Sequence, residues 1–467
     1  MFINRFLFFG PFFVSCLAFE HTYKPVLKKL ENFKAIEGNF TFNQGYVGNP
    51  GGKYGVFNFP DSLKPPLLRH EGQKAFKFFN ATKISVSMYE KDAVILLMNT
   101  PPSGKYFSMV NYVMARFQHN QTNILPWAPT VQINDPINQL SINTSDDKAY
   151  NATVLFISTA DDDTYHEIKN AFIDSGFHPK SINLLPILKE KVKLRTHRIW
   201  YLDESDLISW HFRLGEYNHL DSEIIKYLNT TFKFYYLSYE GFEKSNPIVE
   251  TTLRNRTTGK TQNSMQNDFD ELILKVTRDM PFQIITLNHV VPDLNQCLMN
   301  KSSYEVFFPI PELNFTGAPG SCDFFVRDCL YSMYPNVHDP VNLEAMRFTK
   351  NRTYTLVGIN QVEMNTTIYS NLLITVLKNP ENVNHTLNLT STDLKGSASR
   401  YGEKYSNFFV YQWTRTCLEK EYCTEVTYNQ INPDTDYVIF AERKYLNPMT
   451  KIGPDPNELI PMKIIIQ

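Results

Sequence analysis

Thirteen N-x-S/T triplets are spread along this chain of 467 residues, and they restrict which segments can be buried. Each is an acceptor for N-glycosylation if the chain enters a eukaryotic secretory pathway, and a glycan needs a surface position. The triplets begin at Asn39, Asn80, Asn120, Asn143, Asn151, Asn229, Asn255, Asn300, Asn314, Asn351, Asn365, Asn384 and Asn388. Polar surroundings favour surface positions for Asn143, Asn151, Asn255 and Asn384, whereas Asn229 directly precedes an expected strand and is expected to be hidden.

The first residues are typical of a secretory signal peptide. Arg5 gives a positively charged start, the run 6–17 is mostly apolar, and small residues at Cys16 and Ala18 favour cleavage after Ala18. The run is shorter than the ~20 apolar residues that a membrane-spanning helix needs. We therefore expect residues 1–18 to be a signal peptide, and the protein to be secreted or lumenal, without a transmembrane anchor.

Five cysteines remain after such cleavage, and in an oxidising compartment they are expected to form disulfides. Cys417 and Cys423 flank a short segment and are the first expected pair. Among Cys297, Cys322 and Cys329 one pair and one left-over thiol are expected, and spacing alone leaves the choice open. We take Cys322 and Cys329 as the second pair, because they are closest in sequence.

The composition favours a large β-rich core and excludes some partners. Aromatic residues make up 14% of the chain, and such residues are enriched in strands. The formal net charge is −2, without a long run of one sign, so the electrostatic basis for nucleic-acid binding is missing.

Hydrophobic periodicity divides the rest of the chain into three segments. Residues 19–150 are expected to be β-rich, with strands at Ala93–Met98 and Tyr106–Met114 joined by the turn 101–104 into an antiparallel hairpin. Residues 151–282 are expected to form an α/β unit, either in series with the other two segments or inserted between them, and residues 283–467 a β-rich segment with the disulfides.

The middle segment is the most regular. A strand at Thr153–Ser158 is followed by Tyr165, Ile168 and Phe172 at helical spacing and by a further strand from Ile182. We therefore predict a β-rich α+β fold, with antiparallel β-sandwich-like segments around a central α/β unit of ferredoxin-like β-α-β type.

Two acidic groups are candidate sites. Asp161, Asp162 and Asp163 offer oxygen ligands of the kind that Ca²⁺ takes, although aspartates at a strand-to-helix junction also cap helices. Asp203, Glu204 and Asp206 form the second group, which could hold Ca²⁺, act as an acid/base pair, or lie in a solvated turn.

No catalytic motif stands out, so the sequence leaves open whether the protein is an enzyme. The aromatic strand Phe232–Tyr239 could line a sugar or lipid site, although alternating aromatic residues usually belong to a core. We expect an extracellular binding or structural module for a glycan, lipid or protein ligand. The alternative is a secreted hydrolase that uses the acidic residues of the second group.

Overall fold

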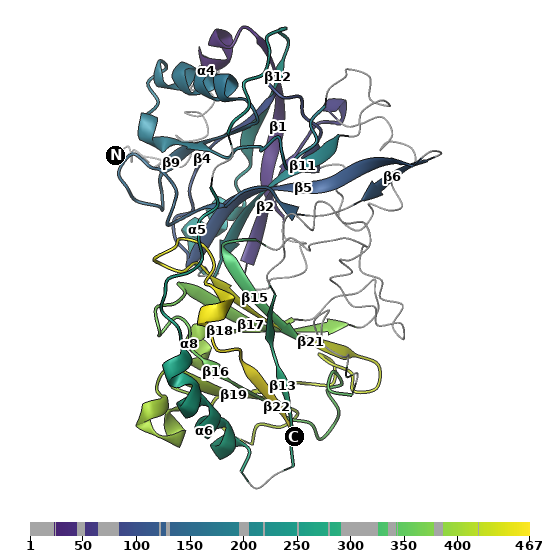
Figure 1. Cartoon of the computed structure of the whole chain (residues 1–467), viewed down its shortest axis with the longest axis vertical. Coiled ribbons are helices and arrows are strands. Elements are labelled where there is room, and N and C mark those ends of the chain that lie inside the picture. Colours follow the sequence, from purple (N-terminus) through teal and green to yellow (C-terminus); the bar gives the residue numbers. More distant parts are fainter. Residues whose placement is uncertain are drawn as a thin grey trace, which may run out of the picture.

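A computed structural model of the chain has its strands in three sheets, one above and two below in the view of Figure 1. It describes residues 23, 25–43, 52–63, 84–120, 123–127, 131–195, 205–217, 220–249, 252–278, 281–290, 326–334, 342, 344–377, 386–418 and 420–467. The short 3-10 helices are η1 (Asp61–Leu63), η2 (Pro179–Ser181), η4 (Asn263–Met265), η6 (Ser399–Tyr401), η7 (Glu403–Tyr405) and η8 (Pro456–Glu458).

The N-terminal half is built on a curled sheet of twelve strands. These are β1 (Phe33–Asn43), β2 (Gly52–Asn58), β3 (Ser85–Val86), β4 (Ala93–Asn99), β5 (Tyr106–Asn120), β6 (Asn123–Trp127), β7 (Val131–Gln132), β8 (Ile137–Asn138), β9 (Thr153–Thr159), β10 (Ile182–Leu184), β11 (Asp206–Gly215) and β12 (Phe232–Tyr239). Their order is β10-β9-β4-β12-β1-β2-β11-β5-β6, with β3 beside β11 and with β7 and β8 beside β5.

Large aromatic rings fill the inner face of this half-barrel, and glycines on neighbouring strands make room for them. A Cβ atom at Gly38 would collide with the ring of Phe234, and one at Gly55 with the ring of Phe40. Both rings are completely buried in the main core of the N-terminal half. Because these glycines have no side chain, each ring has room over the neighbouring strand, and the rings pack closely inside the curled sheet.

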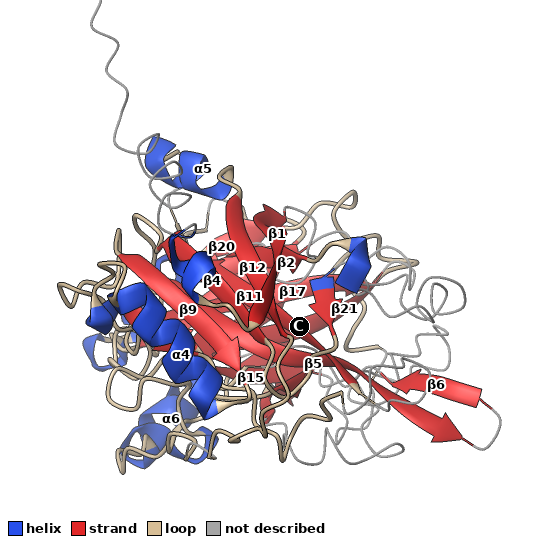
Figure 2. Cartoon of the chain, turned by 90° about the horizontal axis from the view of Figure 1, so that it is seen from above, coloured by secondary structure: helices blue, strands red, loops and turns tan. Residues whose placement is uncertain are grey.

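One helix covers the outer face of the same sheet, and a second helix packs into its inner core. α4 (Asp162–Ile173) connects β9 to the parallel strand β10 and lies over β9 in Figure 2. Its buried side chains Ile168 and Phe172 pack in one core with Leu155 and Ile157 of β9. The shorter α5 (Ser222–Leu228) precedes β12, begins at its N-cap Asp221, and packs with Ile224 and Tyr227 in the inner core.

The C-terminal half consists of two antiparallel-rich sheets of five strands that share one core. The strand order of the first sheet is β13 (Gln283–Thr286), β22 (Lys463–Ile466), β16 (Tyr354–Ile359), β19 (Phe408–Thr414) and β20 (Cys423–Glu425). The strand order of the second sheet is β14 (Asn288–Val290), β15 (Cys329–Tyr334), β21 (Tyr437–Tyr445), β17 (Tyr369–Leu377) and β18 (Thr386–Thr390). Trp413 of the first sheet stacks on Phe440 of the second, with ring centroids 6.3 Å apart.

Helix α6 (Gln266–Val276) belongs to this C-terminal half and not to the α/β unit. Its buried residues Phe269, Leu272 and Ile273 pack against β16, β19 and β22. The short helix α8 (Ser391–Leu394) follows β18. Strands β9 to β12 belong to the same sheet as β1 to β8, so the segment expected at 151–282 contributes strands to one half and a helix to the other.

One expected pairing is wrong. β4 and β5 do not form a hairpin, because β12, β1, β2 and β11 lie between them in the sheet. The connecting segment runs across the ends of other strands: the N–H of Thr100 donates to the carbonyl of Ala152, and the N–H of Lys105 to the carbonyl of Glu216. These bonds take the place of a tight turn.

The two halves meet where β2, β5 and β11 face β15, β17 and β21 (Figure 1). This junction contains buried apolar side chains from both sides, such as Val110 and Met114 from the N-terminal half and Leu446 from the C-terminal half. The rings of Tyr106 and Tyr445 contact each other across it at an angle of 41°, with centroids 4.5 Å apart. The junction is therefore a packed core of its own.

Candidate functional site

One open pocket of about 710 Å³ lies at the end of the curled sheet, where β12 ends. Its walls come from segments that are far apart in the sequence: the turn 89–91 before β4, Arg195, and most of residues 238–245. The pocket therefore exists only because β4 and β12 are neighbours in the sheet.

Asp92 is a fully buried carboxylate that ties two walls of the pocket together. It accepts the backbone N–H of Tyr89 at 2.9 Å and that of Tyr239 at 3.0 Å, and the hydroxyl of Tyr236 also donates to it. Burial raises the pKa of Asp92 to about 6, although these hydrogen bonds act in the opposite direction. Asp92 thus fixes the positions of the two tyrosines that line the pocket.

Cations and aromatic rings are paired around the opening. The guanidinium of Arg195 lies 4.3 Å from the ring centroid of Tyr89, and the ammonium of Lys91 lies 4.8 Å from that of Tyr239. Lys91 also forms an ion pair of 3.2 Å with Glu243. These contacts hold the two rings and two charged groups in fixed positions around the opening.

The chemistry of this arrangement suits binding more than proton transfer. Lys91 and Tyr239 hold the pKa of Glu243 below its usual range, so this exposed carboxylate accepts hydrogen bonds and does not supply a proton at neutral pH. Phe242 is 98% exposed and extends an apolar ring from the same loop. Rings beside polar groups are what a ligand with apolar and hydroxylated faces requires.

The aromatic strand contributes one aromatic residue to this site. Tyr239, at the end of β12, lines the pocket, whereas Phe232, Phe234 and Tyr236 are buried in the core of the half-barrel. Tyr235 packs against the helix-covered face. Most of the alternating aromatic residues are therefore core residues.

The acidic group proposed for catalysis is only partly within the described residues. Asp203 and Glu204 lie outside them. Asp206 is buried in β11 and accepts two hydrogen bonds from Arg116, at 2.8 and 2.7 Å, and one from the backbone N–H of Lys193 at 2.8 Å. Asp206 is thus held in a buried ion pair, away from the pocket walls, and neither a solvated turn nor a free catalytic carboxylate is seen at this position.

The candidate Ca²⁺ ligands Asp161, Asp162 and Asp163 instead organise the start of α4. Asp161 is the N-cap and accepts the N–H of Thr164 at 2.8 Å, and Asp163 accepts the side-chain N–H of Asn246 at 2.9 Å. No group of three His, Cys, Asp or Glu side chains in the described ranges could hold a metal ion. The helix-capping interpretation is therefore confirmed for Asp161.

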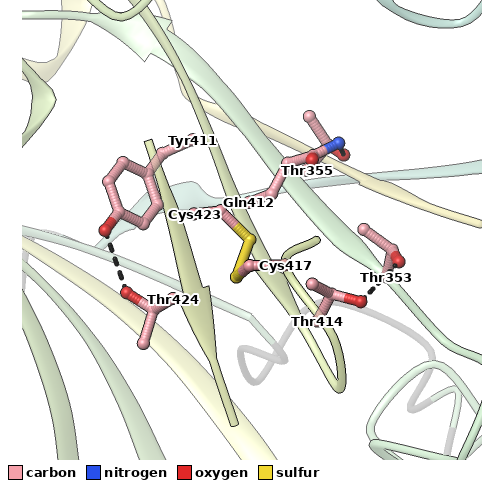
Figure 3. The surroundings of a disulfide bond; sticks show 8 residues. All are labelled: Thr353, Thr355, Tyr411, Gln412, Thr414, Cys417, Cys423 and Thr424. Carbon is pink, nitrogen blue, oxygen red and sulfur yellow. Dashed lines mark hydrogen bonds between the residues drawn. A yellow bond between two sulfur atoms is a disulfide. The ribbon is translucent and has the colours of Figure 1, made fainter. Parts of the chain in front are cut away.

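The expected disulfide between Cys417 and Cys423 is present and fastens the loop between β19 and β20 (Figure 3). Around it, Tyr411 and Thr424 hydrogen bond at 2.9 Å, and Thr353 donates to Thr414 at 3.1 Å.

Cys329 does not form the second disulfide that spacing favoured. It carries a free, buried thiol on β15. Burial raises the pKa of this thiol to about 12, so it is protonated and unreactive at neutral pH. Cys297 and Cys322 lie outside the described residues. Closeness in sequence was misleading because β15 turns the Cys329 side chain into the junction between the halves.

The acceptor asparagines lie on the surface wherever their side chains are described, apart from the partly buried Asn388. Asn229, which was expected to be hidden, is exposed at the C-terminal end of α5. The exposed acceptors are Asn39, Asn143, Asn151, Asn229, Asn255, Asn351 and Asn365. The described residues do not include Asn80, Asn300, Asn314 and Asn384, nor the side chain of Asn120.

Sequence reasoning missed most of the pocket residues. The pocket residues come from three segments that are far apart in sequence, around Tyr89 and Lys91, at Arg195 and around Glu243, and they belong to no motif. No local signal therefore connects the three segments. The Tyr-Glu-Lys-Asp turn before a strongly apolar strand was the only available clue, and it is equally typical of an ordinary turn.

Comparison with known proteins assigns no family. No protein-family model matches the chain, and no curated protein matches it significantly. Among solved structures, an uncharacterised protein from Burkholderia cenocepacia is similar over 98% of this chain and 90% of its own, with 7% identity and a TM-score of 0.34. A protein from Vibrio parahaemolyticus is similar over 81% and 87%, with 9% identity and a TM-score of 0.31. Within the described ranges, no helix has both the length and the apolar character needed to cross a membrane.

Proposed function

We propose that this chain is a secreted, N-glycosylated binding protein that holds a glycan in the pocket at the end of β12. The observation that carries the proposal is the placement of three aromatic rings, Tyr89, Tyr239 and Phe242, beside charged groups around one opening. Aromatic faces pack on the apolar faces of sugar rings, while the carboxylate of Glu243 is an acceptor for hydroxyl groups.

Binding to a glycan is tested most cleanly with Phe242→Ala, because this side chain is 98% exposed and contributes little to folding. Tyr428→Ala is a matched control, since Tyr428 is a half-exposed aromatic residue that does not line the pocket. A glycan array with the secreted protein identifies ligands, and titration calorimetry measures them. We expect Phe242→Ala to weaken binding about ten-fold, which corresponds to the upper range of one aromatic contact.

Two results would contradict glycan binding. One is the absence of any glycan bound by the wild-type protein, and the other is an equal loss of affinity in Phe242→Ala and Tyr428→Ala. A lipid or protein ligand, which the sequence also allowed, would then have to be sought on another surface.

Secretion is supported by the exposed acceptor asparagines and by the disulfide, which is typical of oxidising compartments. Expression with its own leader in eukaryotic cells, followed by enzymatic deglycosylation and mass spectrometry of the medium, tests this part. We expect a secreted protein whose mass falls on deglycosylation. An unmodified protein retained in the cytosol would refute the proposed localisation.

The second candidate function, a secreted hydrolase, has one observation in its favour. Glu90 and Glu243 approach the pocket from segments distant in sequence, as paired catalytic carboxylates do. However, Glu90 is paired with Lys189 and Glu243 with Lys91, so both carboxylates are already engaged. Mass spectrometry of bound glycans after long incubation separates the functions, because hydrolysis that Glu243→Gln abolishes would identify an enzyme.

We propose that the other parts of the fold hold the pocket in place and do not contact the ligand. The shared core of the C-terminal sheets supports a β-sandwich-like arrangement, and the parallel pairing of β9 and β10 across α4 supports a unit with part of the ferredoxin-like topology. Neither feature contributes a side chain to the pocket.

A further inference from the structure

The junction between the two halves carries buried charged groups as well as apolar ones. From the N-terminal half, Tyr54 of β2, Tyr112 of β5 and Arg213 of β11 face it, and from the C-terminal half Tyr331 of β15 and Arg443 of β21 face it. Within each half the pairs are direct cross-strand neighbours: Arg213 lies opposite Tyr54, and Arg443 opposite Tyr331. Two arginine–tyrosine pairs therefore meet in the junction.

Arg213 connects the two halves. Its guanidinium donates to the hydroxyl of Tyr112 at 2.6 Å and to that of Tyr331 at 3.5 Å. It also lies 5.5 Å from the ring centroid of Tyr54 and 5.8 Å from that of Tyr112. These contacts give this cation hydrogen-bond acceptors and aromatic faces from both sides of the junction.

Arg443 is in a different position. Its Nε and Nη1 atoms are buried and have no hydrogen-bond partner, while the residue as a whole keeps some exposure to solvent. Its guanidinium lies 5.8 Å from the ring centroid of Tyr331, a contact that does not satisfy its N–H donors. A buried, fully charged donor without an acceptor is unfavourable unless an anion completes it.

Within the described ranges, none of the ionisable groups that act most strongly on Arg443 is a carboxylate. The ionisable groups that act on it most strongly are Tyr445, Tyr54, Tyr331 and Cys329. Burial raises the pKa of the Cys329 thiol to about 12 and the pKa values of Tyr331 and Tyr445 well above their usual range, so these groups are neutral at pH 7.

The nearby buried carboxylate, Asp328, does not accept a hydrogen bond from the buried Nε and Nη1 atoms of Arg443. Asp328 accepts the hydroxyl of Tyr106 at 2.5 Å, and Arg213 is the first of the cations that act on it. One buried carboxylate therefore stands against two buried guanidinium groups in this part of the junction.

We propose that Arg443 binds an anionic oxygen group, a phosphate, sulfate or carboxylate, at the junction between the two halves. The planar guanidinium matches the paired oxygens of such groups better than any other side chain. Tyr54, which is partly exposed and acts on Arg443 from the opposite sheet, places a hydroxyl donor near the same position. The site is separate from the glycan pocket and goes beyond the proposed function.

Titration calorimetry of the purified full chain tests the proposal with sodium phosphate, sulfate and acetate, each at constant ionic strength set by chloride. The three salts distinguish the classes of anionic group. We expect saturable binding of at least one anion by the wild-type protein, at least ten-fold weaker binding by Arg443→Met, which keeps the aliphatic length, and an intermediate affinity for Arg443→Lys. Phe242→Ala should bind the anion like the wild type, which separates this site from the glycan pocket.

Arg347→Met is the matched control, because Arg347 also lies over a tyrosine ring, 4.8 Å from the centroid of Tyr437, but donates to the hydroxyl of that residue. We expect it to bind like the wild type. If Arg443→Met does not fold, Arg443→Lys is used to test the proposal in its place. We then expect Arg443→Lys to bind the anion at least three-fold more weakly than the wild type. The proposal is overturned if the wild type binds none of the three anions saturably, or if Arg443→Met, or Arg443→Lys in its place, binds as tightly as the wild type.

Discussion

Replacing His211 with glutamine tests how far one buried imidazole limits the acid stability of this protein. His211 lies on β11, is 2% exposed, and its Nε2 forms a hydrogen bond of 3.0 Å with the hydroxyl of Ser209. Burial lowers the pKa of His211 to about 3, and the neighbouring cation Arg213 adds to this effect.

The sign and size of the effect follow from linkage. The pKa of His211 in the folded state lies below the value of about 6.5 in the unfolded chain, so folding favours the neutral imidazole. This contribution to stability is complete above pH 6.5 and is lost as the pH falls towards 3. At pH 5 the unfolded value is about 1.5 units above the pH, which corresponds to a loss of about 2 kcal/mol relative to pH 7.

Urea unfolding at pH 7 and pH 5 measures this loss. The free energy of unfolding of the wild type should fall about 2 kcal/mol more between these pH values than that of His211→Gln. His289, whose pKa burial also lowers to about 3, is present in both proteins and cancels in the difference. Equal losses in the two proteins would show that His211 is not held neutral by the fold.

Three further predictions concern buried or cross-linked groups. Asp206→Ala leaves Arg116 buried without its carboxylate and should lower the free energy of unfolding by about 3–5 kcal/mol in urea, so a change below 1 kcal/mol would contradict the buried pair. Replacing Cys417 and Cys423 by serine opens a short loop and should cost about 2 kcal/mol by the same assay, whereas an unchanged midpoint would argue against a stabilising cross-link. The pKa of Asp92 is about 6 in the folded protein, above its unfolded value of 3.8, so its contribution to stability is complete below pH 3.8 and about 3 kcal/mol is lost as the pH rises through 6. The variant Asp92→Asn should not show this loss in urea unfolding. A pH dependence of stability like that of the wild type would refute the raised pKa.

Local signals in the sequence predicted the elements that depend on local interactions. The aspartate that ends a strand, followed by apolar residues at helical spacing, predicted α4 and its N-cap Asp161. Asp221 caps α5 in the same way, because a cap hydrogen bond connects residues two or three positions apart. The close disulfide between Cys417 and Cys423 was predictable because the loop between them is short.

Strand partners and the pocket could not be predicted in this way. The turn 101–104 suggested that β4 pairs with β5, but the curled sheet inserts four strands between them. Cys329 shows the same difficulty, since the face on which its side chain lies depends on how the two halves pack.

The sequence by itself thus determined the β-rich composition, the start of α4, the surface positions of Asn143, Asn151 and Asn255, and the short disulfide. Each of these depends on residues adjacent in the chain or on overall composition. Only the tertiary structure decided which strands are neighbours, which brings Tyr89, Lys91 and Glu243 around one pocket and leaves Arg443 buried without an acceptor. These arrangements depend on contacts between residues far apart in sequence, and such contacts are selected by the packing of whole sheets, which no local pattern encodes.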